Sequence, residues 1–383
     1  MERMDLTQLR EKINRIDREL VDLYRERMET ARTIGAWKRE NGVPVYDPGR
    51  ERELLDRVAE QAGAENEDGI RALFSFLISQ SRTRQLLDEG KGGALAEKIR
   101  GALERTPDLF PEKAEVACQG VEGAYSQQAC VRLFRHPAIT YFRTFADVFD
   151  AIGSGRCRYG VLPIENSLAG SVHSVYDLLA AHEDYIVRSI RIRIDHALLT
   201  LPEAEAGDIR EVYSHEQAIH QCSEYLGRHG EWKVIPCTNT AAAARMVAES
   251  GRKDIAAISS VHCAALYGLK CQNAEIQNNS NNHTRFICVS REPEVYPGAD
   301  RTSLLLTLPD RPGELSRILG MFNAQGINLT KLESRPVAGR DFEFMFCFDM
   351  DASVYSPAFT RLLGTLEAAA DSLTWLGSYS EKV

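Results

Sequence analysis

Residues 6–27 read LTQLREKINRIDRELVDLYRER, and this stretch predicts that the chain begins with one long helix over about its first forty residues. The apolar side chains recur at alternating intervals of three and four residues. They are Leu6, Leu9, Ile13, Ile16, Leu20 and Leu23. This spacing is typical of a helix that packs along another helix. The next position on the same face is Arg27, so a charged side chain stands where the pattern requires an apolar one.

Arg27 and two further cations suggest an anion-binding site on this helix. A buried guanidinium is costly unless an anion meets it. Lys38 returns to nearly the same face about 16 Å further along the axis, so the two long side chains could converge on one small anion. Arg10 lies about 25 Å before Arg27 and can reach the same ligand only from an antiparallel partner helix. The pattern therefore predicts an intertwined homodimer, the alternative being that Arg10 and Lys38 are ordinary solvated residues.

Two more helices follow the first. A break at residues 42–44 precedes Asp47 and Pro48, after which charged residues open a second helix. A third helix over 70–87 carries Ser81 and Gln85 four positions apart, hence on one face. Residues 5–88 resemble the all-helical chorismate mutase domain. By that resemblance the substrate-contacting positions are Arg10, Arg27, Lys38, Asp47, Arg50, Glu51, Ser81 and Gln85.

The resemblance implies a reaction that needs shape and charge rather than an acid, a base or a nucleophile. Chorismate rearranges to prephenate in a pericyclic step. Arginines would clamp the two carboxylates and hold the reactive conformer. Lys38 and Gln85 would donate to the ether oxygen, on which negative charge grows as the bond breaks. Glu51 would accept the ring hydroxyl, and Asp47 would orient the cations rather than touch the substrate.

Length and charge restrict the class of protein. The 383 residues exceed what one hydrophobic core usually organises, so we expect several domains. The formal net charge of −9 argues against a nucleic-acid partner. The sequence lacks the run of about 20 apolar residues that a membrane span requires, and residues 1–10 contain no apolar signal core. We therefore expect a cytoplasmic protein without a membrane partner.

The cysteines and glycines give no sign of a cofactor. The nine cysteines include no Cys-x-x-Cys pair, and no group of His and Cys has the spacing of a zinc site. We expect reduced and mostly buried thiols. Gly153, Gly155 and Gly160 do not form a dinucleotide fingerprint. The sequence therefore predicts neither a metal nor an organic cofactor.

The pattern changes after a polar stretch at 88–93, a short helical connector and a boundary at 107–113. We expect a helical domain over 1–90, a linker over 91–113, an α/β domain over 114–292 and a last domain over 300–383. In the α/β part short apolar strands alternate with helices, and Gly, Ser, Thr or Asn stands at each joint. Predicted strands are 116–120, 161–165, 212–214, 234–239 and 255–259; predicted helices are 125–134, 217–226, 240–249 and 261–267. Helix N-termini gathered at the carboxyl ends of strands suit a small dianion.

Four segments in this α/β part resemble prephenate dehydratase over residues 116–291: LPIENSLAGSV, YSHEQAIHQC, NTAAAARMVAES and IQNNSNNHTRF. The family fold is that of two-lobed periplasmic binding proteins, with the substrate between the lobes. The resemblance assigns the catalytic step to Thr284, in the motif Thr284-Arg285-Phe286. It implies that substrate is bound by Glu165, Asn166, Ser214, His215, Gln221 and Arg285.

The dehydratase reaction joins loss of carbon dioxide to departure of the para hydroxyl, so a hydrogen-bond donor or a general acid must stand near that hydroxyl. A threonine hydroxyl is a poor acid, so Thr284 could orient or polarise the leaving group. Glu165 and His215 remain as alternative proton donors. His215 could instead only shape its loop, and Arg285 could form a structural ion pair rather than clamp a carboxylate.

The last part of the chain reads strand, helix, two strands, helix, strand, at 302–308, 314–325, 327–335, 342–349, 356–370 and 373–377. This βαββαβ order is a ferredoxin-like split unit. It resembles an ACT regulatory domain, with PDRPGEL at 309–315 and ESRP at 333–336. The resemblance implies that phenylalanine binds across a dimer interface, at Gly313, Leu315, Asn328, Glu333, Ser334 and Arg335.

Glu314 replaces the alanine that commonly stands beside Gly313 in this family. We expect Glu314 to act only as a helix-starting acid, the alternative being that it repels the carboxylate of the effector.

Mutase, dehydratase and ACT domain in this order are the layout of the bifunctional P-proteins of phenylalanine biosynthesis. The resemblance implies an enzyme with two activities and feedback inhibition by phenylalanine. One alternative is a non-catalytic amino-acid sensor, which the complete mutase set and the Thr284-Arg285-Phe286 motif oppose. The other is a dehydratase for arogenate, whose side chain carries an amine; a mutase that makes prephenate in the same chain favours the keto acid.

Overall fold

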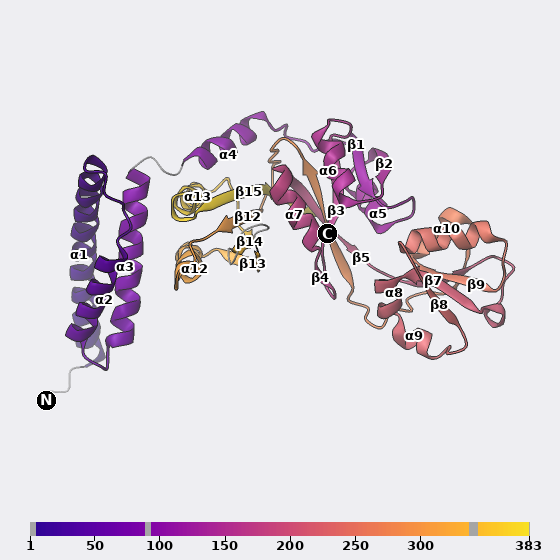
Figure 1. Ribbon diagram of the computed structural model, residues 1–383, viewed down its shortest axis with the longest axis horizontal. Coiled ribbons are helices and arrows are strands. Elements are labelled where there is room, and N and C mark those ends of the chain that lie inside the picture. Colours follow the sequence, from indigo (N-terminus) through magenta and orange to yellow (C-terminus); the bar gives the residue numbers. More distant parts are fainter. Residues whose placement is uncertain (1–4, 89–92, 337–343, 383) are drawn as a thin grey trace. The chain divides into compact units, whose positions relative to one another are not determined.

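The computed structural model describes residues 5–88, 93–336 and 344–382. The chain divides into two compact units, one formed by residues 1–100 and 305–373 and the other by residues 101–304 and 374–383 (Figure 1). Each unit is described in turn.

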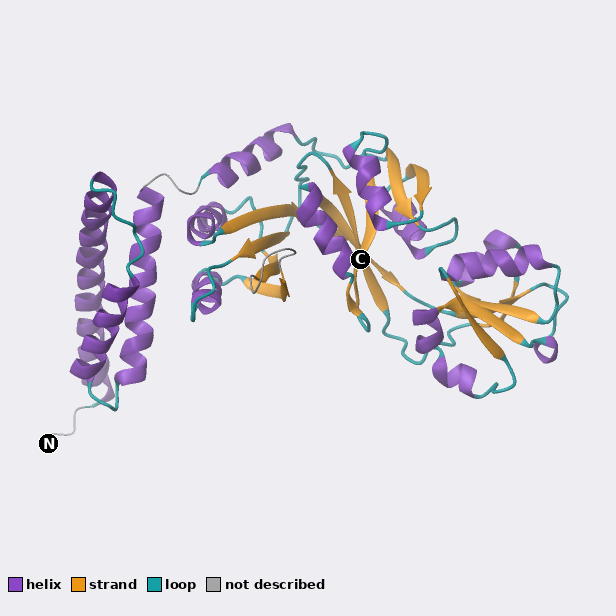
Figure 2. Ribbon diagram, viewed as in Figure 1, coloured by secondary structure: helices purple, strands orange, loops and turns teal. Residues whose placement is uncertain are grey.

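Three helices form the N-terminal part of the first unit: α1 (Leu6–Glu40), α2 (Pro48–Ala62) and α3 (Glu67–Asp88). Asp5 and Gln8 form a capping box at the start of α1, and Asp47 caps α2. Both α1 and α2 pack along α3, and Figure 2 shows the three lying lengthwise beside one another. The predicted long first helix is confirmed, and a further helix, α4 (Ala94–Arg105), occupies much of the predicted linker.

The apolar face of α1 is not covered within one chain. Leu6 is 62% exposed and Leu23 is 60% exposed. Only Ala31 and Gly35, near the C-terminal end of the helix, are buried. An exposed apolar stripe of this length indicates a surface that packs against another molecule.

The predicted βαββαβ order of the last domain is confirmed. Its elements are β12 (Arg301–Thr307), α12 (Glu314–Ala324), β13 (Asn328–Pro336), β14 (Phe344–Asp351), α13 (Pro357–Ala369) and β15 (Ser372–Tyr379). The strands form one sheet in the order β13-β14-β12-β15. Phe342, where a strand was predicted to begin, lies outside the described residues.

The second unit contains two sheets, one for each lobe of the predicted two-lobed α/β domain. The first has the order β16-β5-β11-β3-β1-β2, with β4 paired to β3. Its strands are β1 (Lys113–Gln119), β2 (His136–Phe142), β3 (Tyr159–Asn166), β4 (Gly170–Ser171), β5 (Tyr185–Arg193), β11 (His283–Ser290) and β16 (Glu381–Lys382). Its helices are α5 (Tyr125–Leu133), α6 (Phe145–Gly153) and α7 (His173–His182).

The second sheet has the order β10-β6-β9-β7-β8. Its strands are β6 (Ala197–Thr200), β7 (Glu211–His215), β8 (Lys233–Cys237), β9 (Ile255–Ser259) and β10 (Lys270–Asn273). The helices of this lobe are η1 (Ala206–Asp208), α8 (Glu216–Gln221), α9 (Ser223–Gly227), α10 (Thr240–Ser250) and α11 (Val261–Tyr267). Strand β7 runs parallel to β8 and β9, so the strand-to-helix joints of these strands gather at one edge of the sheet, as predicted.

One predicted helix is wrong. The sequence predicted a single helix over 217–226, whereas the chain forms α8 and α9 with a break at Cys222. The reason is visible at Gln221, whose backbone oxygen accepts a 2.7 Å hydrogen bond from the Asn278 amide and is therefore not used to continue the helix.

Strand β11 brings two distant parts of the first sheet together. It runs antiparallel to both β3 and β5. Its register sets Thr284 opposite Asn166 and Arg285 opposite Glu165. The dehydratase motifs predicted from sequence thus meet across two paired strands.

The cysteine prediction is confirmed. All nine cysteines are free, and all except Cys237 and Cys271 are buried. Within residues 5–88, 93–336 and 344–382, no helix is long and apolar enough to cross a bilayer. The same residues contain no group of His, Cys, Asp and Glu side chains able to hold a metal ion.

Candidate active sites

A cavity of about 520 Å³ opens between α1 and α3. Its lining includes Arg27 from α1 and both Ser81 and Gln85 from α3, three of the positions predicted from sequence. Glu26 and Thr30 also line the cavity, together with apolar side chains such as Leu23 and Ile34. Cationic and amide donors in an apolar cavity suit a small organic anion.

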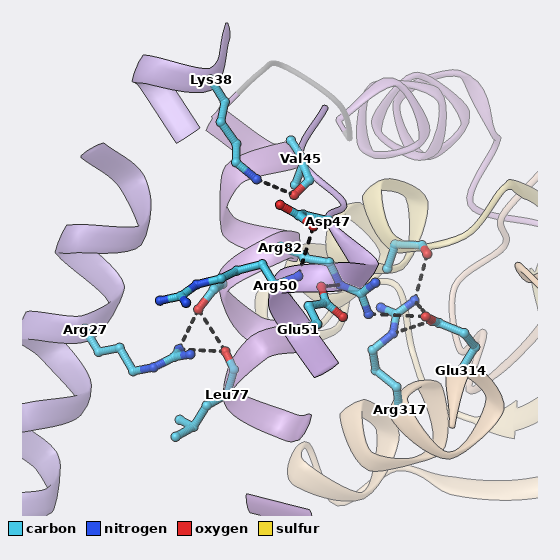
Figure 3. A network of polar contacts seen from close by, with 12 residues as sticks. Arg27, Lys38, Val45, Asp47, Arg50, Glu51, Leu77, Arg82, Glu314 and Arg317 are labelled. Atoms are coloured by element: carbon cyan, nitrogen blue, oxygen red, sulfur yellow. Dashed lines mark hydrogen bonds and ion pairs between the residues drawn. The ribbon is translucent and has the colours of Figure 1, made fainter. Parts of the chain in front are cut away.

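Arg27 is anchored at the wall of this cavity. Its Nη1 donates to the Leu77 carbonyl oxygen at 2.8 Å and to Ser81 Oγ at 2.6 Å (Figure 3). The side chain is half-buried, and burial lowers the pKa of the guanidinium from its ordinary value. Two hydrogen bonds on one nitrogen fix the direction of the group, so its remaining donors stay available to a bound anion.

Gln85 is buried against the backbone of α1. Its Oε1 has no hydrogen-bond partner among the described residues. A Cβ added at Gly35 would lie 2.7 Å from Gln85 Cγ and 3.1 Å from Gln85 Cβ. The missing side chain at Gly35 therefore makes the space that Gln85 occupies.

We expect Gly35→Ala to lower mutase activity by up to about 100-fold, because the new methyl group displaces the Gln85 side chain from its position. The gain in helix propensity of about 1 kcal/mol opposes an overpacking cost of about 1–3 kcal/mol, so the free energy of unfolding should fall by no more than about 2 kcal/mol. Mutase kcat/KM and urea unfolding measure the two effects. Gly69→Ala, in α3 with open space around it, is the matched control. An unchanged kcat/KM would mean that Gly35 does not position Gln85.

The other predicted mutase residues surround the entry to α2. Lys38 Nζ donates to the Val45 carbonyl oxygen at 2.7 Å (Figure 3). Asp47 Oδ1 accepts from the Arg50 backbone N–H at 3.0 Å, so it caps the helix. Arg50 pairs with Glu53 at 2.8 Å and is exposed. We expected Asp47 to orient side-chain cations. In this contact its partner is instead the backbone amide of Arg50.

Glu51 belongs to a contact that sequence reasoning missed. It lies 3.5 Å from Arg82 Nε, and Arg82 also lies 3.2 Å from Glu314 Oε1. Burial is the largest influence on Glu51 and raises the pKa of its carboxyl. No sequence spacing could indicate Arg82, because Glu314 is 232 positions away in the chain.

Arg10 is exposed on α1 and on the same straight helix as Arg27. The helix spacing predicted that Arg10 cannot reach the cavity of its own chain, and in the structure it does not.

The dehydratase residues meet where β3 and β11 pair. Asn166 Nδ2 donates to Thr284 Oγ1 at 2.9 Å, while Asn166 Oδ1 accepts from the amides of Leu168 and Ala169 at 3.1 and 2.9 Å. Because the turn holds Asn166, its amide group is directed toward Thr284. Thr284 Oγ1 accepts in this contact, which leaves its own proton available to another acceptor.

The same network continues into the second lobe. Asn166 Nδ2 also donates to Asn282 Oδ1 at 2.8 Å, and Asn282 Nδ2 donates to Gln221 Oε1 at 3.1 Å. Gln221 Oε1 lies 2.9 Å from His196 Nε2. His196 was not predicted. It is buried, and burial lowers the pKa of its imidazole, which favours the neutral form; the Gln221 oxygen then accepts from the N–H at Nε2.

Ser214 and His215 are engaged outside this network. Ser214 Oγ donates to the Ile258 carbonyl oxygen at 2.7 Å. His215 caps α8, and its Nδ1 accepts from the Gln217 amide at 3.3 Å. This contact matches the alternative in which His215 shapes its loop. When the ring is neutral, its proton lies on Nε2.

Glu165 and Arg285 form an ion pair, with Arg285 Nη2 lying 3.3 Å from Glu165 Oε2. The ion-pair alternative for Arg285 therefore describes this structure. Because Glu165 is the more exposed partner, its carboxylate remains accessible to solvent.

The predicted regulatory residues lie on two elements of the ACT domain. Gly313 is the N-cap of α12 with φ 88°, and Leu315 follows in the first turn. The other four lie on β13 and are Asn328, Glu333, Ser334 and Arg335. Asn328 Nδ2 donates to Asp351 Oδ2 at 2.7 Å, and Glu333 pairs with Lys331 at 3.3 Å.

The expectation that Glu314 acts only as a helix-starting acid is wrong. Its side chain is 7% exposed and forms ion pairs with both Arg317 and Arg82. A buried carboxylate requires such partners, so Glu314 is part of a charge network rather than a terminal cap.

Comparison with known families divides the chain in the same order. The model of chorismate mutase type II matches residues 9–86, that of prephenate dehydratase matches 116–294 and that of the ACT domain matches 302–363.

Two relatives are informative. The bifunctional chorismate mutase/prephenate dehydratase of Escherichia coli K12 is 33% identical over 99% of this chain and 97% of its own length. The chloroplastic arogenate dehydratase/prephenate dehydratase 1 of Arabidopsis thaliana is 36% identical, over 70% of this chain and 72% of its own length.

Solved structures match about the same share of the chain as the Arabidopsis relative. GqqA, described as a novel type of quorum quenching acylase, has a TM-score of 0.64 and 32% identity over 70% of this chain and 98% of its own. The prephenate dehydratase of Arthrobacter aurescens in complex with L-Phe has a TM-score of 0.64 and 28% identity, over 70% and 90% respectively.

Both catalytic domains are therefore present, and the relative that matches nearly every residue is an enzyme with both activities. The alternative of a non-catalytic sensor is wrong. Taken with the cavity at Arg27 and the paired strands at Thr284, these matches show that the chain belongs to the bifunctional chorismate mutase/prephenate dehydratase family of phenylalanine biosynthesis.

Proposed function

We propose that residues 1–90 form the mutase, residues 91–113 a linker, residues 114–292 the dehydratase and residues 300–383 the regulatory domain. The mutase residues of this proposal are Arg10, Arg27, Lys38, Asp47, Arg50, Glu51, Ser81 and Gln85. The dehydratase residues are Glu165, Asn166, Ser214, His215, Gln221, Thr284 and Arg285. The observation that supports it best is that Arg27, Ser81 and Gln85 line one cavity although they come from separate helices.

In the mutase, charge and shape hold chorismate in its reactive conformer. Arg27 binds one carboxylate with the donors that Leu77 and Ser81 leave available. Lys38 and Gln85 donate to the ether oxygen as the carbon–oxygen bond breaks and negative charge grows there. Glu51 accepts the ring hydroxyl. No proton is transferred in this step, so positioning and electrostatic stabilisation account for the rate.

In the dehydratase, the electrons of the breaking bond to carbon dioxide enter the ring, and the para hydroxyl leaves with its bonding electrons. The leaving group needs one proton to depart as water. Thr284 donates a hydrogen bond to it, because Asn166 already occupies an acceptor position of the Thr284 oxygen. The alternative sources of the proton itself are Glu165 in its protonated form and His215 as an imidazolium, which would give up the contact of its Nδ1 with the Gln217 amide.

The active mutase is a homodimer, alone or within a dimer of dimers. The exposed apolar face of α1 supports this part of the proposal, because it is too long to remain in water. A partner α1 running antiparallel covers that face and brings its own Arg10 to the cavity. Each mutase site then contains residues of two chains.

Mixing two inactive variants should restore mutase activity if Arg10 comes from the partner. Arg10→Ala and Arg27→Ala each lose the activity as pure dimers, whereas a mixed dimer contains one intact site. Chorismate consumption after co-expression measures the recovery. The control mixes Arg27→Ala with Ser81→Ala, whose positions lie on one chain and cannot complement. Recovery in neither mixture would contradict the shared site.

The ACT domain binds L-phenylalanine at Gly313, Leu315, Asn328, Glu333, Ser334 and Arg335 and so provides feedback inhibition. That the prephenate dehydratase of Arthrobacter aurescens was solved in complex with L-Phe supports L-phenylalanine as the effector. The chain acts in the cytoplasm on small molecules, without nucleic acid, membrane, metal or organic cofactor.

Arogenate is the second candidate substrate, since the Arabidopsis relative is named for both arogenate and prephenate. A mutase in the same chain supplies prephenate, which favours the keto acid. Measuring kcat/KM for the two substrates separately decides the matter, and a higher value for arogenate would overturn the preference.

A further inference from the structure

Arg82 lies between two carboxylates that belong to different domains of the first unit. It follows Ser81 on α3 and stands three residues before Gln85. Its Nε is 3.5 Å from Glu51 Oε1, and its Nη2 is 3.2 Å from Glu314 Oε1 (Figure 3). One guanidinium is therefore shared between a mutase residue and a residue of the ACT domain.

Glu314 is held firmly on the ACT side. Its Oε2 accepts from Arg317 Nε at 2.7 Å, and Arg317 Nη2 donates in turn to the Ala369 carbonyl oxygen at 2.9 Å. These contacts tie Glu314 to α12 and to the end of α13. A displacement of this part of the ACT domain therefore moves the carboxylate that Arg82 contacts.

The Arg82 side chain has room to move closer to either Glu51 or Glu314. A cavity of about 870 Å³ lies beside it, lined also by Arg311, Glu314 and Arg317. The guanidinium carbons of Arg82 and Arg311 lie 5.2 and 3.7 Å from the ring centroid of Tyr46. Arg82 therefore also makes a cation–π contact.

The charges around Glu51 affect the pKa of its carboxyl. Burial raises the pKa of the Glu51 carboxyl, and the charge of Glu314 raises it as well. The charges of Arg82, Arg311 and Lys38, from α3, the ACT domain and α1, lower it. An ionised Glu51 accepts a stronger hydrogen bond from the ring hydroxyl of chorismate than a protonated one, so Arg82 favours the more active form and Glu314 opposes it.

We propose that Arg82 is a positioning residue of the mutase, and that Glu314 sets how strongly Arg82 holds Glu51. The inference rests on the proposed role of Glu51. It also gives the buried carboxylate of Glu314 a role. Gly313, directly before Glu314, adopts a left-handed conformation at the turn proposed to bind phenylalanine. An effector at that turn therefore acts directly on the Glu314–Arg82 contact.

The first test measures mutase kcat/KM against pH. Arg82→Gln should lower the plateau about tenfold and move the acidic limb to higher pH, because Glu51 loses its nearest cation. Arg82→Lys keeps the charge and should return the limb toward its original pH. Arg84→Gln is the matched control, since Arg84 lies on the same helix and pairs with Asp88 instead. Conversion of supplied prephenate by each variant shows that the dehydratase is folded, and the far-UV circular dichroism of each variant checks the mutase helices.

Glu51→Ala separates the failure of the inference from that of the proposed function, because it removes the acceptor oxygen that glutamine would keep. If Glu51→Ala leaves mutase activity unchanged, the proposed role of Glu51 is wrong and the inference falls with it. If Glu51→Ala is inactive while Arg82→Gln keeps both the plateau and the acidic limb, Arg82 is not a positioning residue and the inference alone is overturned.

The second test concerns Glu314. Glu314→Gln should move the acidic limb to lower pH. Its effect should be clearly smaller in the Arg82→Gln background, because the part that Arg82 transmits is lost there and only the direct repulsion between Glu314 and Glu51 remains. We also expect inhibition of the mutase by L-phenylalanine to weaken by about fivefold or more, while inhibition of the dehydratase persists. Additive single-variant effects would overturn the coupling. A wild-type enzyme that L-phenylalanine does not inhibit at all would contradict the proposed effector. The coupling between Arg82 and Glu314 would then be judged from the single and double variants measured without effector.

Discussion

Arg27→Ala is expected to reduce the mutase reaction by at least about 100-fold while the conversion of supplied prephenate stays close to the wild-type rate. Arg27 is the half-buried cation at the cavity wall, and its direction is fixed by Leu77 and Ser81. Removing it leaves a substrate carboxylate without its charged partner in a site of low dielectric constant. Separate assays with chorismate and with prephenate measure the two reactions.

Arg25→Ala is the control for this experiment. Arg25 lies on the same helix but is exposed and pairs only loosely with Asp22, at 3.9 Å. Its loss should affect neither reaction. If Arg27→Ala removed both activities in a folded chain, the mutase and dehydratase sites would not be separate.

Thr284→Ala is expected to give an enzyme that accumulates prephenate from chorismate. The dehydratase step should slow by about 100- to 1,000-fold, because the leaving hydroxyl loses its hydrogen-bond donor and Asn166 loses an acceptor. The mutase step should continue, since the residues of its cavity are unchanged. A time course of chorismate, prephenate and phenylpyruvate measures both steps.

Thr284→Ser keeps the hydroxyl and should retain most of the dehydratase activity. The comparison of Ala with Ser at this position separates loss of the donor from loss of packing, because Thr284 is buried. Undiminished formation of phenylpyruvate by Thr284→Ala would remove Thr284 from the mechanism.

The parts of the fold that local pattern determines were predictable. The regular spacing of apolar residues along α1 predicted a helix, and it identified Arg27 as a charged residue at an apolar position. Strand β9 and helix α11 have the predicted bounds. The apolar run of β9 ends before Ser260, which is the N-cap of α11, and Gly268 in a left-handed conformation ends that helix, so the signals for these bounds are local.

The parts that depend on distant contacts were not predictable. Strand β11 is almost wholly buried between β3 and β5, so it lacks the alternation that marks a strand with one solvated face. The break between α8 and α9 depends on Asn278, far along the chain. The same is true of the candidate sites, since Arg82 and His196 acquire their partners only in the folded chain.

The central claim is that one chain performs two consecutive reactions at two separate sites under control by phenylalanine. The most direct test gives the purified chain chorismate without nicotinamide cofactor and resolves prephenate from phenylpyruvate over time, with and without L-phenylalanine. The account predicts that phenylpyruvate forms through prephenate and that added L-phenylalanine reduces it. Prephenate as the only product would contradict the dehydratase assignment, and no turnover of chorismate would contradict the account as a whole.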